Sequence, residues 1–114
     1  MKYSMFIGRW QTIHDGHRWL WNQALDRGKN ALIMIRDCEL DKNNPLTAPE
    51  ILYNLTEEFE DEIIEGRVKL MIVPDIESIN YGRGVGYEII EHTPPEDIKQ
   101  ISGTNIRKNL KNKT

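Results

Sequence analysis

Apolar positions along the chain fall into three short runs, separated by segments in which they recur every three or four residues. Short apolar runs bounded by glycine, proline or polar residues are typical of buried strands. The runs lie at residues 3–7, 31–35 and 68–73. The helical spacing between them predicts the order strand, helix, strand, helix, strand, which favours a parallel α/β sheet. Every position of the run at 31–35 is apolar, which predicts a strand covered on both faces.

Both predicted helices carry start or stop signals. The first spans residues 17–27, and Gly28 is suited to end it, because glycine adopts the left-handed conformation found after helices. The second opens at Thr47 and runs to about Phe59. Thr47 and Glu50 have the spacing of a capping box, and a proline lies in the first turn.

The pattern is less regular after residue 74. Glycines interrupt residues 82–86, residues 87–91 suit a short edge strand, and two prolines at 94–95 break the chain. Ser102 or Thr104 is a candidate cap for a closing helix. No repeat or linker divides the sequence, so we expect one domain over residues 1–114.

Composition narrows the classes of function. The chain has 114 residues, with 15 Lys and Arg against 18 Asp and Glu, and a net charge of −3. This balance gives no general attraction to nucleic acid, so any anion must be bound through local geometry. The absence of a membrane-length apolar run or a signal peptide predicts a cytoplasmic protein without a membrane partner. A single cysteine, Cys38, excludes an internal disulfide and a Cys-only zinc site.

Two of the three histidines lie between the first strand and the first helix. Their segment reads Gly8-Arg9-Trp10-Gln11-Thr12-Ile13-His14-Asp15-Gly16-His17. Ligands of open α/β sheets bind in the loops that follow the strands. The three-residue spacing of His14 and His17 places both imidazoles on one side of a helical turn, beside free backbone N–H groups. Gly16 lets an anion approach the backbone. The segment therefore predicts a phosphate site.

A second signal lies near the C-terminus, in Ile101-Ser102-Gly103-Thr104-Asn105-Ile106-Arg107. Two hydroxyls around Gly103 at a helix start supply caps and N–H groups, and Arg107 follows one turn later, where its guanidinium can pair with phosphate oxygens. Alone, this segment is an ordinary helix cap with a solvated arginine. Together with the histidine segment, it favours a second part of the same anion site.

Simpler interpretations account for other features. Trp10, Trp19 and Trp21 are expected to pack in or near the core. A zinc site would need Cys38 or His92 with carboxylates, and no ordinary ligand spacing is present. The glycines at 82–86 lack the spacing of a dinucleotide fingerprint, and the chain has no P-loop.

The two segments together resemble the signatures of the nucleotidyltransferase superfamily with the HxGH motif. The histidine segment resembles Gly-Arg-Phe-Gln-Pro-x-His-x-Gly-His, and the C-terminal segment resembles Ile-Ser-x-Thr-x-Ile-Arg. Between them, Asn44-Pro45-Leu46-Thr47-Ala48 resembles the Asn-Pro-Phe-Thr-Ala segment of archaeal-type nicotinamide-mononucleotide adenylyltransferases. The resemblance implies a Rossmann-like three-layer sandwich with a mainly parallel sheet, in a single small domain.

The resemblance also implies an activity and a set of site residues. Such enzymes transfer a nucleoside monophosphate, here most readily AMP from ATP, onto a small phosphorylated acceptor and release pyrophosphate. Carried over by position, His14, His17 and Arg107 are catalytic. The nucleotide-binding positions are Gly8, Arg9, Trp10, Gln11, Gly16, Ser102, Gly103 and Thr104. A Mg²⁺ ion held mainly by the nucleotide phosphates completes the site.

Departures from the family pattern leave alternatives open. Thr12 replaces the usual proline, Ile51 replaces an arginine of the archaeal enzymes, and few residues separate Gly86 from Ile101, where the acceptor region is expected. The alternatives are a cytidylyltransferase that uses CTP, or a nucleotide-binding module without turnover. A homo-oligomer that completes the acceptor pocket is a further expectation.

The acceptor itself is not specified by the motifs. Asn80, Tyr81 and Arg83, beside the glycines at 82–86, are candidate acceptor contacts. An ordinary glycine-rich turn explains the same residues equally well.

Overall fold

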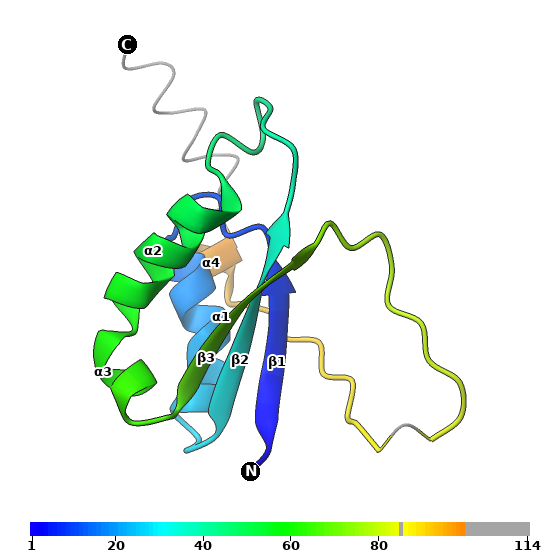
Figure 1. Cartoon of the computed structure of the whole chain (residues 1–114). Helices are drawn as coiled ribbons and strands as arrows, with labels where there is room; N and C mark the ends of the chain where they lie inside the picture. The colour runs from blue at the N-terminus through cyan, green and yellow to red at the C-terminus, as the bar shows by residue number, and fades with distance from the viewer. Residues whose placement is uncertain (85, 100–114) are drawn as a thin grey trace.

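Three parallel strands form the sheet, in the spatial order β1-β2-β3 (Figure 1). The computed structural model describes residues 1–84 and 86–99. The strands are β1 (Tyr3–Gly8), β2 (Asn30–Asp37) and β3 (Val68–Pro74). The helices are α1 (Asp15–Leu25), α2 (Ala48–Glu58), α3 (Glu60–Ile64) and α4 (Glu96–Lys99). The predicted order of strands and helices and the parallel α/β sheet are confirmed.

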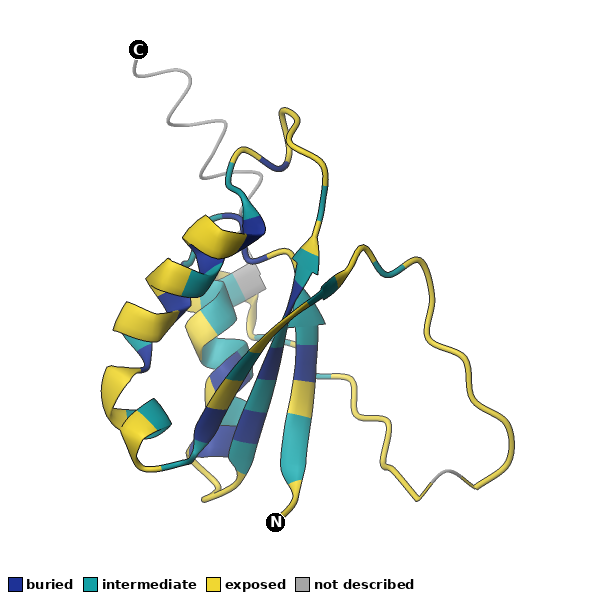
Figure 2. Cartoon of the chain, viewed as in Figure 1, coloured by how far each residue is buried: buried dark blue, intermediate teal, exposed yellow. Residues whose placement is uncertain are grey.

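The helices α1 and α2 cover one face of the sheet (Figure 1). On that face Ala31, Ile33 and Ile35 of β2 are fully buried. On the other face Met5 of β1 and Met71 of β3 are 51% and 48% exposed. Figure 2 shows the exposed positions of the chain in yellow. Within the described residues the helices cover one face of β2, and on its other face Leu32 and Met34 are half-buried. A run that is apolar at every position hides the two-residue alternation that would reveal which face is packed.

The core lies between the sheet and these two helices. Trp21 and Ala24 of α1 and Ile51 and Leu55 of α2 are buried, and three of these four side chains have no exposed surface. Their spacings of three and four residues give each helix one apolar stripe, which is the pattern expected of helices packed on a sheet. The core thus fixes the position of both helix N-termini relative to the ends of the strands.

The ends of the helices follow local chemistry. α1 begins two residues earlier than predicted because His14 caps it, and Gly28 adopts the predicted left-handed conformation, with φ +75°. The capping box of α2 is confirmed: Glu50 N–H donates to Thr47 Oγ1 at 3.2 Å, and Thr47 N–H donates to Glu50 Oε1 at 3.1 Å. The short helix α3 was not expected from the pattern.

The capping box makes a testable contribution to acid stability. Hydrogen bonds from the Thr47 backbone and side chain lower the pKa of Glu50 below its usual 4.5. A lowered pKa means that the bond stabilises the fold above pH 4.5 and that this stabilisation is lost as the pH falls through the folded value. We expect the difference in melting temperature between the wild type and Glu50→Ala to shrink steadily below pH 4.5. A difference that is constant from pH 7 to pH 2.5 would contradict this role.

The segment after β3 does not form the predicted edge strand. Residues 87–91 are extended without strand pairing, and Tyr87 and Ile89 are 79% and 70% exposed. From Pro74 the chain arches away from the sheet and then returns to α4, which contacts α1 (Figure 1). The composition of this segment was compatible with an edge strand, but no strand of the described residues pairs with it. None of the helices within residues 1–84 and 86–99 is long and apolar enough to cross a bilayer.

Candidate functional site

The histidine segment lies at the carboxyl end of β1 and leads directly into α1 (Figure 1). Because β1 and β2 are parallel, the loop after β2 emerges at the same edge of the sheet. Ligand sites of open α/β sheets form at this edge. The structure therefore places the predicted site where two loops and the N-termini of α1 and α2 come together.

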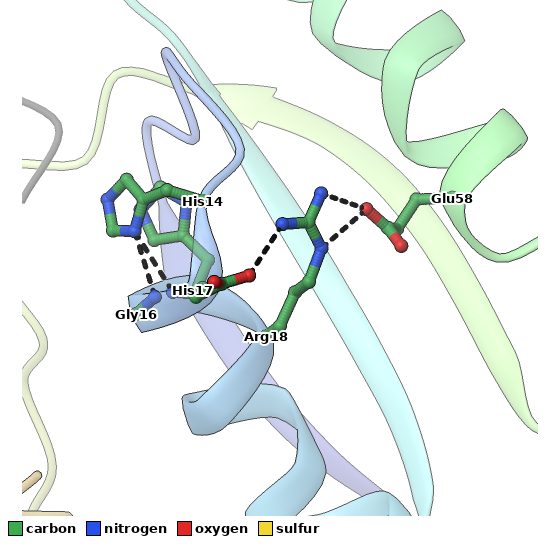
Figure 3. A network of polar contacts seen from close by, with 6 residues as sticks. His14, Gly16, His17, Arg18 and Glu58 are labelled. Atoms are coloured by element: carbon green, nitrogen blue, oxygen red, sulfur yellow. Dashed lines mark hydrogen bonds and ion pairs between the residues drawn. The ribbon is translucent and has the colours of Figure 1, made fainter. Parts of the chain in front are cut away.

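His14 is the N-cap of α1. Its Nδ1 accepts hydrogen bonds from the backbone N–H of Gly16 at 3.0 Å and of His17 at 3.4 Å (Figure 3). An accepting Nδ1 assigns the ring proton to Nε2, so the capping form of His14 is neutral and presents an N–H donor from the opposite edge of the ring. Two of the backbone N–H groups that were predicted to face an anion are thus taken by His14. In this arrangement these two amides serve the helix cap.

His17 stacks directly on His14. The ring centroids are 3.8 Å apart and the planes differ by 21°, which confirms that the three-residue spacing brings both imidazoles together (Figure 3). Two indoles pack against His17: the Trp10 ring lies at 5.0 Å between centroids in a T-shaped contact, and the Trp21 ring lies at 5.7 Å with the planes tilted by 34°. Trp10 and Trp21 are buried, as predicted for core residues. This packing fixes the orientation of His17 before any ligand is present.

An ion-pair network neutralises the acidic residue beside the histidines. Arg18 Nη1 lies 3.0 Å from Asp15 Oδ1, and Arg18 Nη2 lies 2.8 Å from Glu58 Oε1 (Figure 3). The hydrogen bond to Glu58 is the main cause of a raised Arg18 pKa, so the guanidinium stays charged. Without Arg18, the Asp15 carboxylate next to the cap would repel an approaching anion. The network also ties α1 to the end of α2.

Gly8 is required here by packing. A Cβ atom on Gly8 would lie 2.9 Å from Cε2 and Cζ2 of the Trp10 indole. That indole is 5% exposed, its Nε1–H donates to Met34 O at 2.9 Å, and Trp10 itself has the unusual φ of +49°. Gly8 therefore makes room for the ring that supports His17.

Replacing Gly8 with alanine is expected to destabilise the fold by about 1–3 kcal/mol, because the buried indole must shift. Urea unfolding would measure the change. Gly82→Ala is the matched control, since a Cβ atom at Gly82 meets nothing within 4 Å. Equal urea midpoints for the wild type and Gly8→Ala would contradict this prediction, because they would show that the Trp10 indole can move without cost.

Gln11 and Arg9 connect the histidine loop to the loop before α2. Gln11 Nε2 donates to Leu46 O at 3.2 Å, and Leu46 N–H donates to Gln11 Oε1 at 2.8 Å. Arg9 Nη1 donates to Asn44 Oδ1 at 3.4 Å. Gln11 is 4% exposed, whereas Arg9 is exposed. The predicted nucleotide-binding residues Gly8 to Gln11 thus line one loop, and their roles toward a nucleotide stay predictions.

The remaining predicted residues are distributed as follows. Asn80, Tyr81 and Arg83 are exposed on the segment that arches away from the sheet. Asn80 Nδ2 donates to Ser78 Oγ at 2.9 Å. Among the described residues, none of these three side chains forms a hydrogen bond or ring contact with His14 or His17. Ser102, Gly103, Thr104 and Arg107 lie outside the described residues.

Cys38 lies at the same edge of the sheet, where it is grouped with Asp75 and Arg36 rather than with the histidines. Burial, followed by its contact with Asp75 at 3.5 Å, raises the pKa of the Cys38 thiol. Asp75 also pairs with Arg36 at 2.8 Å. Within residues 1–84 and 86–99, no three side chains of His, Cys, Asp or Glu are grouped closely enough to hold a metal ion.

A cavity of about 230 Å³ lies elsewhere, between α1 and the α2–α3 segment, with Arg18, Glu58 and Arg67 among its lining residues. Neither His14 nor His17 lines it. Sequence reasoning missed this cavity, and it also missed the contacts of Gln11 and Arg18. Gln11 and Leu46 are 35 positions apart in the sequence, and Arg18 and Glu58 are 40 positions apart, so no short motif links the members of either pair.

The sequence matches no protein-family model and no curated protein. The residues of the histidine segment and their arrangement are therefore the basis for a proposed function.

Proposed function

We propose that this protein is a nucleotidyltransferase that moves a nucleoside monophosphate, AMP from ATP in the favoured case, onto a small phosphorylated acceptor. The observation that carries the proposal is the stacked pair of His14 and His17 at the start of α1. Oriented donors at the carboxyl edge of a parallel sheet suit a triphosphate. In the proposed reaction an acceptor oxygen bonds to the α-phosphorus, the bond from that phosphorus to the bridging oxygen breaks, and pyrophosphate leaves.

The state of His14 fits this chemistry. Because Nδ1 is committed to the helix cap, Nε2–H is a donor whose direction is set before binding. Displacement at phosphorus needs positioning and charge stabilisation more than a covalent nucleophile. His14 and His17 would therefore hold and stabilise the charge that develops around the α-phosphate.

The described chain that leads to the C-terminal segment packs beside α1. α4 ends at Lys99 and contacts α1, and His92 packs against Trp19 of α1 with ring centroids 6.4 Å apart. We propose that Ser102, Gly103 and Thr104 bind the β- and γ-phosphates. Arg107 would neutralise their charge during catalysis.

Mg²⁺ enters the proposal with the nucleotide. The described part of the chain groups no set of carboxylates and imidazoles that could enclose the ion. This suits Mg²⁺, which usually retains water and binds through substrate phosphates. Bound there, the ion would draw negative charge from the phosphate oxygens.

The Rossmann-like three-layer arrangement belongs to the same proposal. The described residues provide one helical layer and the sheet, and the face that carries Met5 and Met71 would receive the other layer. In a parallel sheet both faces are ordinarily covered.

Pyrophosphate release tests the activity. The full chain would be incubated with Mg²⁺, ATP or CTP, and a panel of small phosphorylated acceptors. We expect release with ATP and at least one acceptor, and weaker release with CTP. His92→Ala should react like the wild type, because His92 lies against Trp19 rather than beside His14. No nucleotide binding and no release with any acceptor would refute the proposal.

A nucleotide-binding module without turnover is the second candidate. It is favoured by the exposed positions of Asn80, Tyr81 and Arg83 on the segment that arches away from the sheet. Saturable ATP binding without pyrophosphate release across the panel would select this candidate.

A further inference from the structure

One side chain joins the two loops of the candidate site. Gln11 lies in the histidine loop and is 4% exposed. Its amide nitrogen donates to the carbonyl of Leu46 at 3.2 Å, and its amide oxygen accepts from the N–H of Leu46 at 2.8 Å. A single side chain thus satisfies both backbone polar groups of a residue 35 positions away, as a neighbouring strand would.

Leu46 is the residue before the N-cap of α2. Thr47 and Glu50 complete the capping box immediately after it, so the position of Leu46 sets where α2 begins. The Arg9 to Asn44 hydrogen bond, at 3.4 Å, links the same two loops at a more exposed point. Gln11 therefore joins the histidine loop to the N-terminus of α2, in addition to the core packing of Ala48 and Ile51.

We propose that Gln11 is a positioning residue that acts through Leu46 to hold the start of α2 beside His14 and His17, so that two loops form the triphosphate site. This inference rests on the proposed function. It gives Gln11 a role that needs no direct contact with the nucleotide, because both polar ends of its amide already have backbone partners.

The chemistry of the contact requires glutamine. The amide is a donor and an acceptor at once, and both are needed by Leu46. Glutamate lacks the donor when ionised, asparagine is one methylene shorter, and methionine fills the volume without either hydrogen bond. Removing the amide also leaves the N–H and carbonyl of Leu46 without these partners, which is costly at a half-buried position beside the core.

The test compares Gln11→Met with Gln23→Met in the full chain. Gln23 is a suitable control because its half-buried amide donates to a backbone carbonyl within α1, Trp19 O at 3.0 Å, and not across the loops. For each variant we would measure KM and kcat for ATP by pyrophosphate release. Hydrogen exchange at the Leu46 N–H and the melting temperature would be measured without nucleotide.

We expect Gln11→Met to raise the KM for ATP about tenfold, with a much smaller change in kcat, and to speed exchange at Leu46 about tenfold or more. Gln23→Met should change neither. Unchanged KM in Gln11→Met, or unchanged exchange at Leu46, would overturn the inference while leaving the proposed function intact. A wild-type protein that neither binds nor turns over any triphosphate would instead refute the proposed function, and the inference with it.

Discussion

Replacing His17 with alanine is expected to slow pyrophosphate release about 100- to 1,000-fold, the loss typical of removing one oriented donor from a charge-stabilising site. His17 is stacked on His14 at 3.8 Å and held from behind by Trp10. The protein thus sets the orientation of the His17 ring. Water that enters the space in the alanine variant would not provide a donor with this fixed direction. The measurement is the initial rate at saturating ATP and acceptor, where the loss should appear in kcat.

Two controls separate chemistry from packing in this experiment. Circular dichroism and melting of His17→Ala show whether the fold survives the loss of a ring that touches two buried indoles. His17→Gln retains much of the volume and an N–H donor, so it should recover part of the rate. A folded His17→Ala protein with the wild-type rate would remove His17 from the mechanism.

Replacing Ile51 with alanine is expected to lower the free energy of unfolding by about 2–5 kcal/mol, because a fully buried side chain of α2 leaves a cavity against the sheet. Ile51→Arg should be more severe, since it places an unpaired charge in the core. Urea unfolding of both variants would measure the effect. The exposed neighbour Asn54 provides the control, and Asn54→Ala should stay within about 0.5 kcal/mol of the wild type.

The burial of Ile51 also bears on the proposed function, because the resemblance given in the sequence analysis implies an arginine at this position. In this chain the side chain faces the core at 0% exposure, so it does not face the carboxyl edge of the sheet. A stable, fully folded Ile51→Arg variant would contradict this placement, because it would show that the side chain reaches water.

The sequence predicted the fold where local signals are strong. The three apolar runs became β1, β2 and β3, and Thr47 and Glu50 form the capping box that their spacing indicated. The pairing of His14 with His17 was also predictable, because residues three apart lie together on a helical turn. These features depend on neighbours in the chain, and such neighbours are visible in a single sequence.

Features that depend on distant residues were not predictable. Nothing near Gln11 indicates that its amide pairs with Leu46, or that the ring of Trp10 fills the space over Gly8. The capping role of His14 was missed because histidine is an uncommon N-cap, and short polar side chains are the usual signal. Residues 87–91 are rich in strand-forming residues, but strand formation needs a partner that the pattern cannot supply.

The binding of a triphosphate by His14 and His17 is tested most directly by NMR of the imidazole nitrogens. The three histidines would be followed by ¹⁵N spectra while Mg²⁺ and ATP are added to the full chain. We predict saturable shifts at Nε2 of His14 and His17, with His92 unchanged against Trp19. Spectra in which His14 and His17 do not move, or in which His92 moves as much as they do, would contradict the proposed site.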